Sequence, residues 1–386
     1  MIFFLILSII ALFLVTISSV TLAIGMKKMK NLRNMEKGDS MTGLLVTIIV
    51  PACNEEKNIE KSILSLLDQD YKNLDIIVVN DRSTDNTAAV LAKLQDRFPR
   101  LNVHEVTELP HGWMGKSHAL AVGSKLAKGE YLVFTDADVI LEKTTITRAV
   151  SYMTTNGLDH LTMVFKNMTR GWLLNSLILD AGMSLLVLFR PWMVKKGSNR
   201  YFVGIGAFNM VKKSVYRKIG GHEGIRMHPV DDVMLGKSVK QHGFSQDCLL
   251  AYDFVAVPWY DSVGAMIKGL EKNMFSLVHY RVLLIPILLF AIIVPTIFPV
   301  WGIIFGDLSV RTICLLTLAI RLATFFKGLQ KQEMSTWYFP GCLITPYISC
   351  YIIVKAVFVT LTNGGIIWRG QHYALAELRK AEPLLF

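Results

Sequence analysis

Two aspartates separated by a single residue carry the clearest chemical signal in the sequence. Asp136-Ala137-Asp138 directly follows an apolar run at 131–135, which predicts a buried strand. Carboxylates at a strand end repel one another unless a cation joins them, and hard oxygen ligands suit Mg²⁺ or Mn²⁺. The pattern therefore indicates a divalent-metal site at Asp138 and Asp136. An aspartate pair that caps the next helix is the alternative interpretation.

Two earlier apolar runs, at 45–50 and 74–79, also end in polar residues. The first leads into Pro51-Ala52-Cys53-Asn54-Glu55-Glu56, and the second leads into Asn80-Asp81-Arg82-Ser83-Thr84-Asp85. In open α/β sheets, ligands bind at the carboxyl edge of the strands. Two acceptor-rich loops side by side at that edge can hold a nucleoside.

A second acidic pair, Asp231-Asp232, opens a segment at 233–242 that predicts a helix. Acidic residues favour helix starts because of the helix dipole, so a purely structural role is one interpretation. The functional interpretation is a general base. His222, which ends an expected tight turn, and His228 match no usual zinc-ligand spacing, and we expect no metal there.

Alternating strands and helices must position these residues. From about 44 to 260, short apolar runs alternate with charged segments of helical periodicity, which is typical of βαβ units and a mostly parallel sheet. We expect helices at 58–67 and 84–98, the second capped by Ser83 or Asp85, a further strand at 103–106 and a loop at 110–113. A chain of 386 residues accommodates one large α/β domain with flanking elements.

The beginning of the chain predicts a membrane anchor. Residues 1–25 carry no charged side chain and are long enough to cross a bilayer as a helix. The basic residues follow this run at Lys27, Lys28, Lys30, Arg33 and Lys37, whereas a cleavable signal peptide would begin with them. The positive-inside bias then places the middle of the chain in the cytosol.

Apolar sequence returns at 281–368, where we expect two to three spans or interfacial helices. The runs are 282–306, interrupted by three prolines, 312–326, which contains Arg321, and 334–354. Lys327 and Lys331 favour a cytosolic loop, which requires two crossings before it. The apolar part of 170–196 contains Asp180, and it predicts a buried helix of the soluble domain, an interfacial helix or a transmembrane helix.

Charge and cysteine usage exclude two classes of protein. The net charge is +11, but no basic stripe with interleaved aromatic residues indicates a nucleic-acid partner. Much of the positive charge lies beside apolar runs, where it suits anionic lipid headgroups. The five cysteines are scattered without a CxxC pair, which fits a reducing compartment rather than a disulfide or zinc framework.

The ordered motifs resemble those of family 2 glycosyltransferases, which have the GT-A fold, a Rossmann-like α/β architecture. The resemblance covers about 44–260 and rests on five motifs in the expected order, with no GxGxxG or Walker loop to favour another nucleotide fold. The motifs are Pro51-Ala-Cys-Asn-Glu, Asn80-Asp-Arg-Ser-Thr-Asp, Gly115-Lys116, Asp136-Ala-Asp138 and Asp231-Asp232-Val-Met-Leu235.

The resemblance implies a role for each matching position. Asp81 would hold the uracil of a UDP-sugar, in a nucleoside pocket lined by Pro51, Ala52, Asn54 and Glu55. Lys116 would approach the nucleotide, Asp136 the ribose or donor sugar, and Asp138 the metal ion, with Asp136 as a second metal ligand. Asp232 matches the catalytic base and Asp231 stands where Glu is usual, so which of the two is the base stays open.

Within this family the chain is most similar to lipid-modifying members: carotenoid glucosyltransferases and, more distantly, ceramide and hopanoid-associated enzymes. Trp113-Met-Gly-Lys116 and Trp368-Arg369-Gly-Gln-His-Tyr373 carry that similarity, although the second is also a plausible membrane-interface anchor. The QxxRW motif of processive synthases is missing near 268–276. This absence favours a single sugar transfer.

The resemblance thus implies a multi-pass cell-membrane enzyme that transfers one sugar, with inversion, from UDP-glucose to a lipid such as a carotenoid, hopanoid or glycerolipid. The alternatives are a polyprenyl-phosphate or processive polysaccharide enzyme and an inactive sugar-nucleotide-binding scaffold. The expected organisation is an anchor at 1–25, a basic linker at 26–43, a cytosolic GT-A domain at 44–280, the membrane region at 281–368 and a tail at 369–386.

Overall fold

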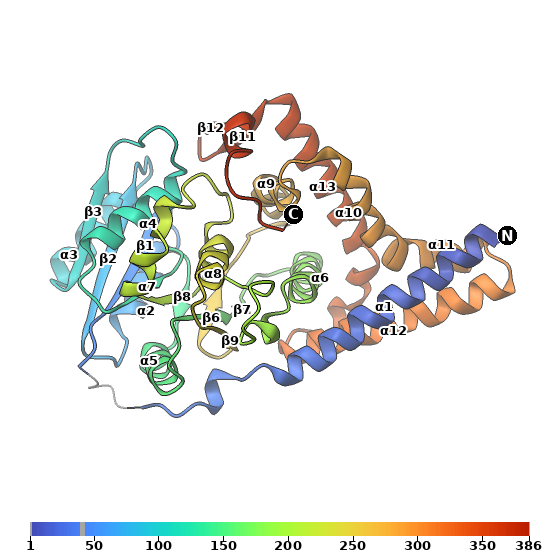
Figure 1. Cartoon of the computed structure of the whole chain (residues 1–386), viewed down its shortest axis with the longest axis horizontal. Coiled ribbons are helices and arrows are strands. Elements are labelled where there is room, and N and C mark those ends of the chain that lie inside the picture. Colours follow the sequence, from blue (N-terminus) through green and yellow to red (C-terminus); the bar gives the residue numbers. More distant parts are fainter. Residues whose placement is uncertain (1, 39–42, 386) are drawn as a thin grey trace. The chain divides into compact units, whose positions relative to one another are not determined.

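The computed structural model describes residues 2–38 and 43–385, and its contacts divide the chain into two compact units. The sheet unit comprises Met29–Met168 and Pro191–Trp259. The helical unit comprises the residues up to Lys28, Thr169–Arg190 and the residues from Tyr260 onward. Labels in Figure 1 identify the elements of both units.

A seven-stranded sheet forms the centre of the sheet unit, in the order β3-β2-β1-β4-β8-β6-β9. Strands β3 to β4 run parallel, and β6 runs parallel to β9, whereas β8 is antiparallel to both of its neighbours. The strands are β1 (Val46–Ala52), β2 (Leu74–Asp81), β3 (Leu101–Val106), β4 (Tyr131–Phe134), β6 (His160–Val164), β8 (Asn209–Lys212) and β9 (Gln246–Leu250). A smaller sheet joins β5 (Ile140–Leu141), β10 (Val255–Val257) and β7 (Lys166–Asn167).

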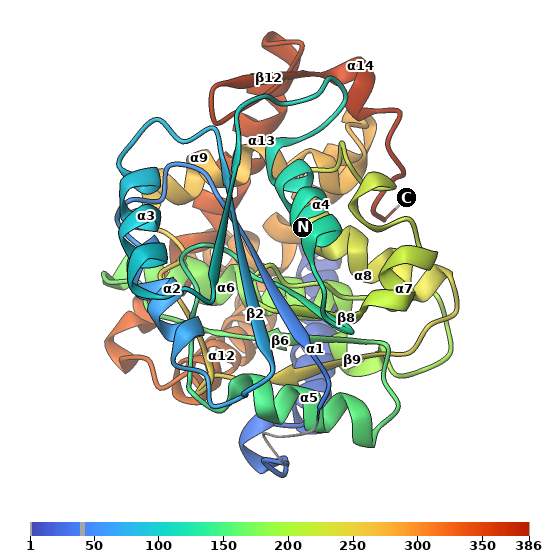
Figure 2. The ribbon, with the colours of Figure 1, turned by 90° about the vertical axis from the view of Figure 1, so that its left-hand side faces the viewer.

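Helices cover both faces of the large sheet (Figure 2). Alternate residues of β1 point to opposite faces, so Ile48 and Val50 join a core with the buried residues of α2, while Ile49 faces α4. A Cβ at Gly123 of α4 would lie 2.4 Å from Ile49 Cγ2, so this close approach requires glycine. The helices are α2 (Ile59–Leu67), α3 (Thr87–Arg97), α4 (Gly115–Leu126), α5 (Thr145–Thr155), α7 (Lys213–Lys218) and α8 (Asp231–Gln241).

The predicted α/β class with a mostly parallel sheet is confirmed. Each predicted strand and helix exists, but two boundaries were wrong. Pro51 and Ala52 are the last residues of β1 rather than loop residues. Helix α3 begins at Thr87 after Asn86, so neither Ser83 nor Asp85 is its N-cap, although Asp85 Oδ1 accepts the Thr87 N–H at 3.0 Å.

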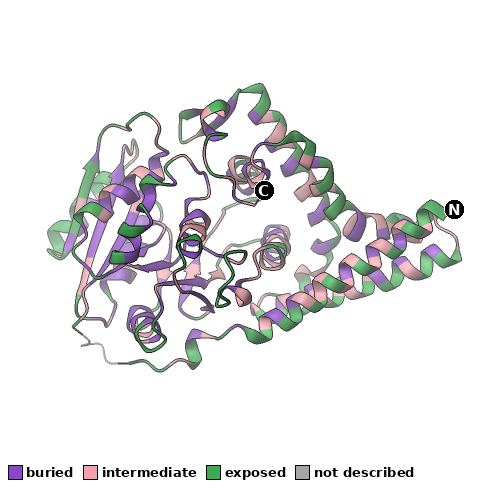
Figure 3. Ribbon diagram, viewed as in Figure 1, coloured by how far each residue is buried: buried purple, intermediate pink, exposed green. Residues whose placement is uncertain are grey.

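The helical unit consists mainly of long apolar helices, and Figure 3 shows many of their residues exposed, unlike the buried strands of the sheet unit. Within the described residues, five segments are long and apolar enough to cross a membrane: 2–28, 172–193, 282–305, 308–331 and 345–362. The elements are α1 (Ile2–Lys28), α6 (Trp172–Phe189), α9 (Val263–Met274), α10 (Ile285–Ile292), the π-helical turn η6 (Ile293–Ile297), α11 (Phe298–Phe305), α12 (Leu308–Lys331), η7 (Thr336–Leu343), α13 (Thr345–Thr362), α14 (Leu375–Leu378) and the hairpin β11 (Gly365–Trp368) with β12 (Gln371–Ala374).

The apolar runs locate these helices but misplace their ends. The run at 312–326 lies inside the longer α12, and the run at 334–354 is not one helix, because a 3₁₀ segment with Pro340 precedes α13. Pro295 falls in the π-helical turn, which absorbs the proline without ending the helical segment. Arg369 and Gly370, both with positive φ, form the tight turn of the β11–β12 hairpin.

Candidate functional site

The loops that follow β1 and β2 are joined by direct hydrogen bonds at the carboxyl edge of the sheet. Asn54 Oδ1 accepts the Thr84 N–H at 2.7 Å, and the Asn54 N–H donates to Ser83 Oγ at 3.0 Å. The Glu55 N–H donates to Thr87 Oγ1 at 2.8 Å. In the β1–β2 register Pro51 and Ala52 pair with Val79 and Asn80. The structure therefore brings together the residues predicted to line a nucleoside pocket.

Asp81 lies at the end of β2 and is almost completely buried. Arg82 donates to both of its oxygens, from Nε at 2.8 Å and from Nη2 at 2.9 Å. Helix α4 begins against this carboxylate, because a Cβ at Gly115 would lie 2.5 Å from Asp81 Oδ2. Glycine at this position lets the first turn of α4, which carries Lys116, approach the nucleoside loops.

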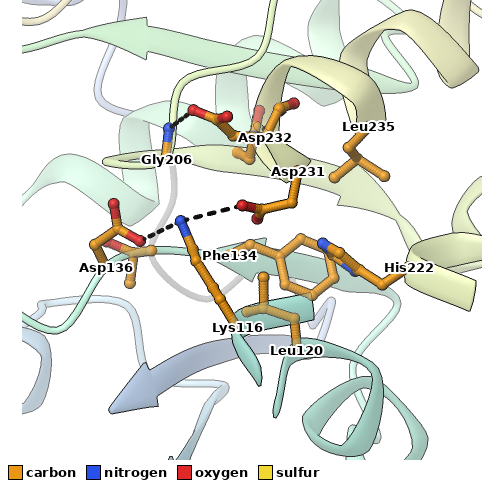
Figure 4. Close-up of a pocket in the computed structure, with 11 residues that line it drawn as sticks. Lys116, Leu120, Phe134, Asp136, Gly206, His222, Asp231, Asp232 and Leu235 are labelled. Carbon is orange, nitrogen blue, oxygen red and sulfur yellow. Dashed lines mark hydrogen bonds and ion pairs between the residues drawn. The ribbon is translucent and has the colours of Figure 1, made fainter. Parts of the chain in front are cut away.

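Lys116 connects the two acidic pairs that the sequence singled out (Figure 4). Its Nζ lies 2.7 Å from Asp136 Oδ1 and 3.6 Å from Asp231 Oδ1. These side chains line one pocket that is open to solvent. The lining is completed by Leu120, Phe134, Thr135, Gly206, Asn209, His222, Asp232 and Leu235.

The site is strongly charged. Burial opposes the charged form of Lys116, but the carboxylates of Asp136, Asp231 and Asp232 outweigh this effect and raise the pKa of Lys116 above its usual value. Burial and the neighbouring Asp231 carboxylate raise the pKa of Asp232 to about 6. An ionised Asp232 is therefore a stronger proton acceptor than an exposed aspartate, which suits a general base.

Gly206 links Asp136 to Asp232 through its backbone. Its N–H donates to Asp232 Oδ2 at 2.8 Å, and its carbonyl oxygen accepts the Asp136 N–H at 3.2 Å. A Cβ at Gly206 would lie 2.7 Å from Asp136 Oδ2, so a larger residue would crowd the pocket. Gly206 was not predicted as a site residue, because a backbone contact leaves no signal in residue type.

His222 is the other pocket residue whose role the sequence did not indicate. It is buried, its backbone N–H donates to Tyr216 Oη at 3.0 Å, and its Nδ1 lies 2.8 Å from the same oxygen. Its ring packs edge-on against the Phe134 ring, with the ring centroids 4.8 Å apart. Burial lowers the pKa of His222 to about 4, so the ring is neutral near pH 7.

Asp138 lies outside the pocket that contains Asp136. Burial, and then the Asp136 and Glu55 carboxylates, raise the pKa of Asp138 to about 7. This accumulation of negative charge fits a divalent cation, which would stabilise the ionised form. The described residues include no cluster of three or more metal-ligating side chains. Asp138 and Asp136 would thus need further oxygen ligands from a bound diphosphate.

Comparison with protein families decides the assignment of the domain. Residues 47–220 match the family described as "Glycosyl transferase family 2". Residues 47–220 therefore form a family 2 glycosyltransferase domain. The GT-A fold follows as well: a mannosyltransferase from Pyrobaculum calidifontis, solved in complex with GDP-Man and Mn²⁺, superimposes with a TM-score of 0.55 over 88% of this chain and 99% of its own, at 19% identity.

Two curated relatives of this domain are 4,4'-diaponeurosporenoate glycosyltransferases. A 4,4'-diaponeurosporenoate glycosyltransferase from Staphylococcus haemolyticus is 26% identical over 62% of this chain. One from Staphylococcus aureus is 27% identical over 59% of this chain. The matches span 63% and 60% of the length of these two relatives.

Proposed function

We propose that this chain is an inverting membrane glycosyltransferase that transfers one sugar, glucose from UDP-glucose, to the hydroxyl group of a lipid acceptor. One observation carries the proposal: Lys116, Asp136, Asp231 and Asp232 line a single pocket of a family 2 domain. The resemblance to carotenoid glycosyltransferases supports the lipid acceptor.

Each charged residue has a defined task in the proposed reaction. Asp81 and Glu55, with Pro51, Ala52 and Asn54, would hold the nucleoside at the ends of β1 and β2. Lys116 would orient the nucleotide while its ammonium group balances the surrounding carboxylates. Asp138 and Asp136 would hold a divalent cation, Mg²⁺ or Mn²⁺, which when bound neutralises charge on a departing diphosphate.

Asp232 would act as the general base. Its carboxylate takes the proton of the acceptor hydroxyl as the acceptor oxygen attacks the anomeric carbon of the donor sugar. A new glycosidic C–O bond forms while the bond between the anomeric carbon and the diphosphate breaks, and the electron pair leaves with the diphosphate. A single displacement of this kind inverts the anomeric centre. Gly206, whose N–H donates to Asp232 Oδ2, positions the base.

The decisive test supplies membranes containing the protein with radiolabelled UDP-glucose, UDP-galactose, UDP-N-acetylglucosamine or GDP-mannose, followed by lipid extraction. We expect label from one UDP-sugar in the lipid fraction, and a loss of that label when EDTA is added. Label in insoluble polymer would contradict single transfer. No transfer from any donor would contradict the enzyme assignment, with membranes lacking the protein as the control.

A further inference from the structure

Helix α6 interrupts the sequence of the sheet unit. This position in the chain restricts the orientations that α6 can take in a membrane. The residues before α6 form β4 and β6, and the residues after it form β8 and β9. Strand β8 pairs with both β4 and β6, and β6 pairs with β9. A bilayer cannot pass through a hydrogen-bonded sheet, so both ends of α6 lie on the same side of the membrane.

The length of α6 also excludes a re-entrant path perpendicular to the membrane. Its 18 residues would extend about 27 Å at about 1.5 Å per residue. The chain would then need roughly eight extended residues to return to the membrane face from which α6 started. Only Arg190 separates Phe189 from Pro191, where the sheet unit resumes. Helix α6 is therefore apolar enough to cross a membrane, but its connections exclude both a crossing and a perpendicular re-entrant path.

Contacts within the helical unit place α6 beside one half of α12. Arg321 of α12 donates to Asp180 Oδ2 of α6 at 3.1 Å, and Thr345 Oγ1 donates to the same oxygen at 2.7 Å. Both charged side chains are largely buried, at 12% and 14% exposure. Pairing of this kind is how ionisable side chains are tolerated within a membrane.

The basic ends of α1 and α12 coincide. Thr324 Oγ1 donates to Ser19 Oγ at 2.9 Å, and Lys331 Nζ donates to the Met26 carbonyl oxygen at 3.5 Å. Lys27, Lys28, Lys327 and Lys331 therefore gather at one end of these two parallel helices. The positive-inside bias assigns that end to the cytosol.

Helix α13 is tied at several points to elements that stay close in sequence to the sheet unit. At its start Thr345 contacts Asp180, and in its middle Lys355 pairs with Glu271 of α9 at 2.7 Å. Beyond its end, Lys272 of α9 lies 3.7 Å above the ring of Trp368. Helix α9 begins at Val263, just after the sheet unit ends at Trp259. If α13 crossed the membrane, its two ends would lie at opposite faces, and these contacts with α6 and α9 could not all form.

One face of α13 is both exposed and apolar. Its residues recur at helical spacing of three and four, namely Tyr351, Val354, Phe358 and Leu361, with exposures from 44% to 66%. Ile352, Ile353 and Ala356 of the same helix are buried. An apolar stripe of this length with aromatic residues suits the acyl chains and interface of one leaflet.

We infer that α6 and α13 lie in the leaflet on the sheet-unit side, with the α13 stripe against its acyl chains, and that the chain crosses the membrane three times. The crossing elements are α1, the continuous segment α10–η6–α11, and α12. The sheet unit, η7 and the β11–β12 hairpin then lie on the cytosolic side. This inference concerns the membrane surface and does not depend on which sugar is transferred.

Single cysteines in a variant whose five native cysteines are replaced by serine test the topology. The exposed probe positions are Ser198→Cys, Ser309→Cys, Ser335→Cys and Ala376→Cys. In intact cells, we expect a membrane-impermeant maleimide to label Ser309→Cys alone, and the other three only after permeabilisation. Retained UDP affinity of each variant shows that the sheet unit is folded.

Each competing topology gives a different pattern. Crossing by all five apolar segments would label Ser198→Cys and Ser335→Cys, and crossing by α13 but not α6 would label Ser309→Cys and Ala376→Cys. Either result overturns the inference, as does labelling of every position except Ser309→Cys.

A second experiment tests the contact between the α13 stripe and lipid. The fluorescence of a bimane attached to Val354→Cys should be quenched by acyl-brominated lipid in nanodiscs, with Ser198→Cys as the control. No quenching at Val354→Cys overturns the assignment of the stripe.

Discussion

Asp232 combines three properties that a general base needs: a position in the pocket, a backbone donor that fixes its orientation, and a raised pKa. The Gly206 N–H holds Oδ2, which leaves Oδ1 to accept a proton. Asp231 instead faces Lys116. This division favours Asp232 as the base and Asp231 as the partner that balances Lys116.

Replacing Asp232 with Asn should lower kcat about 10²–10⁴-fold, because an amide cannot accept the acceptor proton. The Asn side chain keeps the size and can still accept from Gly206, so donor affinity should remain. Measuring transfer and UDP-sugar binding on the same preparation checks both. Unchanged turnover in this variant would refute the base assignment, and Asp231→Asn is the matched control.

The raised pKa of Asp232 predicts how activity depends on pH. The base acts in its ionised form, and burial with the Asp231 charge raises the pKa of Asp232 to about 6. With saturating divalent cation, kcat/KM should therefore fall about tenfold per pH unit below about pH 6. Removing the neighbouring charge in Asp231→Asn should move this acidic limb to lower pH. A limb that does not move contradicts the proposed cause.

At the scale of elements, α8 and the residues around Gly204 are packed backbone to backbone. A Cβ at Gly204 would lie 1.7 Å from the Asp232 carbonyl oxygen, and one at Gly236 would lie 2.0 Å from the Val203 carbonyl oxygen. Two glycines thus allow the first turn of α8 to approach the 203–206 segment. The distance between Asp136 and the proposed base depends on this contact.

Gly204→Ala should push α8 away and separate Asp232 from the Gly206 N–H. We expect a loss of about 1–3 kcal/mol in the free energy of unfolding, because the close backbone contact has no room for a methyl group. Transfer should fall by more than UDP affinity. Gly197→Ala is the matched control, since nothing lies within 4 Å of its added Cβ. Equal behaviour of the two variants would contradict this account.

The ion pair between α6 and α12 makes a second prediction for elements. Arg321→Leu leaves the Asp180 carboxylate buried with Thr345 as its remaining hydrogen-bond donor, and such losses cost about 3–5 kcal/mol. The double variant Asp180→Leu/Arg321→Leu should recover most of that stability. Thermal unfolding in nanodiscs measures both. A double variant no more stable than Arg321→Leu would show that the charge itself is not the cause.

Apolar runs were sufficient to predict β1, β2 and β4, because these parallel strands are buried on both faces. Strands β6, β8 and β9 were not predicted. Strand β6 contains buried polar residues whose partners lie far along the chain: His160 bonds to Asn209 and Gln246, and Thr162 Oγ1 donates to the Phe208 carbonyl oxygen. Partners so distant in sequence cannot be read from local composition.

Residue type alone singled out side chains that lie together in the structure, but it did not single out contributions from the backbone. Asp136, Asp231, Asp232 and Lys116 were singled out by residue type and lie in one pocket. Gly206 contributes a backbone N–H, and His222 acquires its surroundings from Tyr216 and Phe134. Neither contribution depends on a motif that spacing alone could reveal.

At the scale of the whole molecule, the sheet unit contains its own core and proposed nucleotide site, although α6 divides its sequence. Nucleotide binding should therefore not require α6, whereas transfer to a membrane lipid should. We therefore expect the two proposed activities to differ in their dependence on α6.

Replacing Trp172–Phe189 with an 18-residue Gly/Ser linker tests this separation. Such a linker has an r.m.s. length of about 23 Å, close to the about 27 Å of the helix, so it can bridge the same ends. We expect UDP-glucose binding to persist and transfer to lipid to fall sharply, measured in the same nanodiscs. Loss of UDP-glucose binding would show that α6 is part of the nucleotide-binding fold.

The antiparallel strand β8 has a consequence for biosynthesis. It pairs with β4 and β6 but is made about 80 residues after β4, which takes roughly 4–16 s at usual rates of translation. During this interval α6 has emerged from the ribosome while the half-built sheet still has an open edge. An apolar helix and an unpaired strand edge invite aggregation. Early docking of α6 onto the bilayer would keep the nascent chain soluble until β8 closes the sheet.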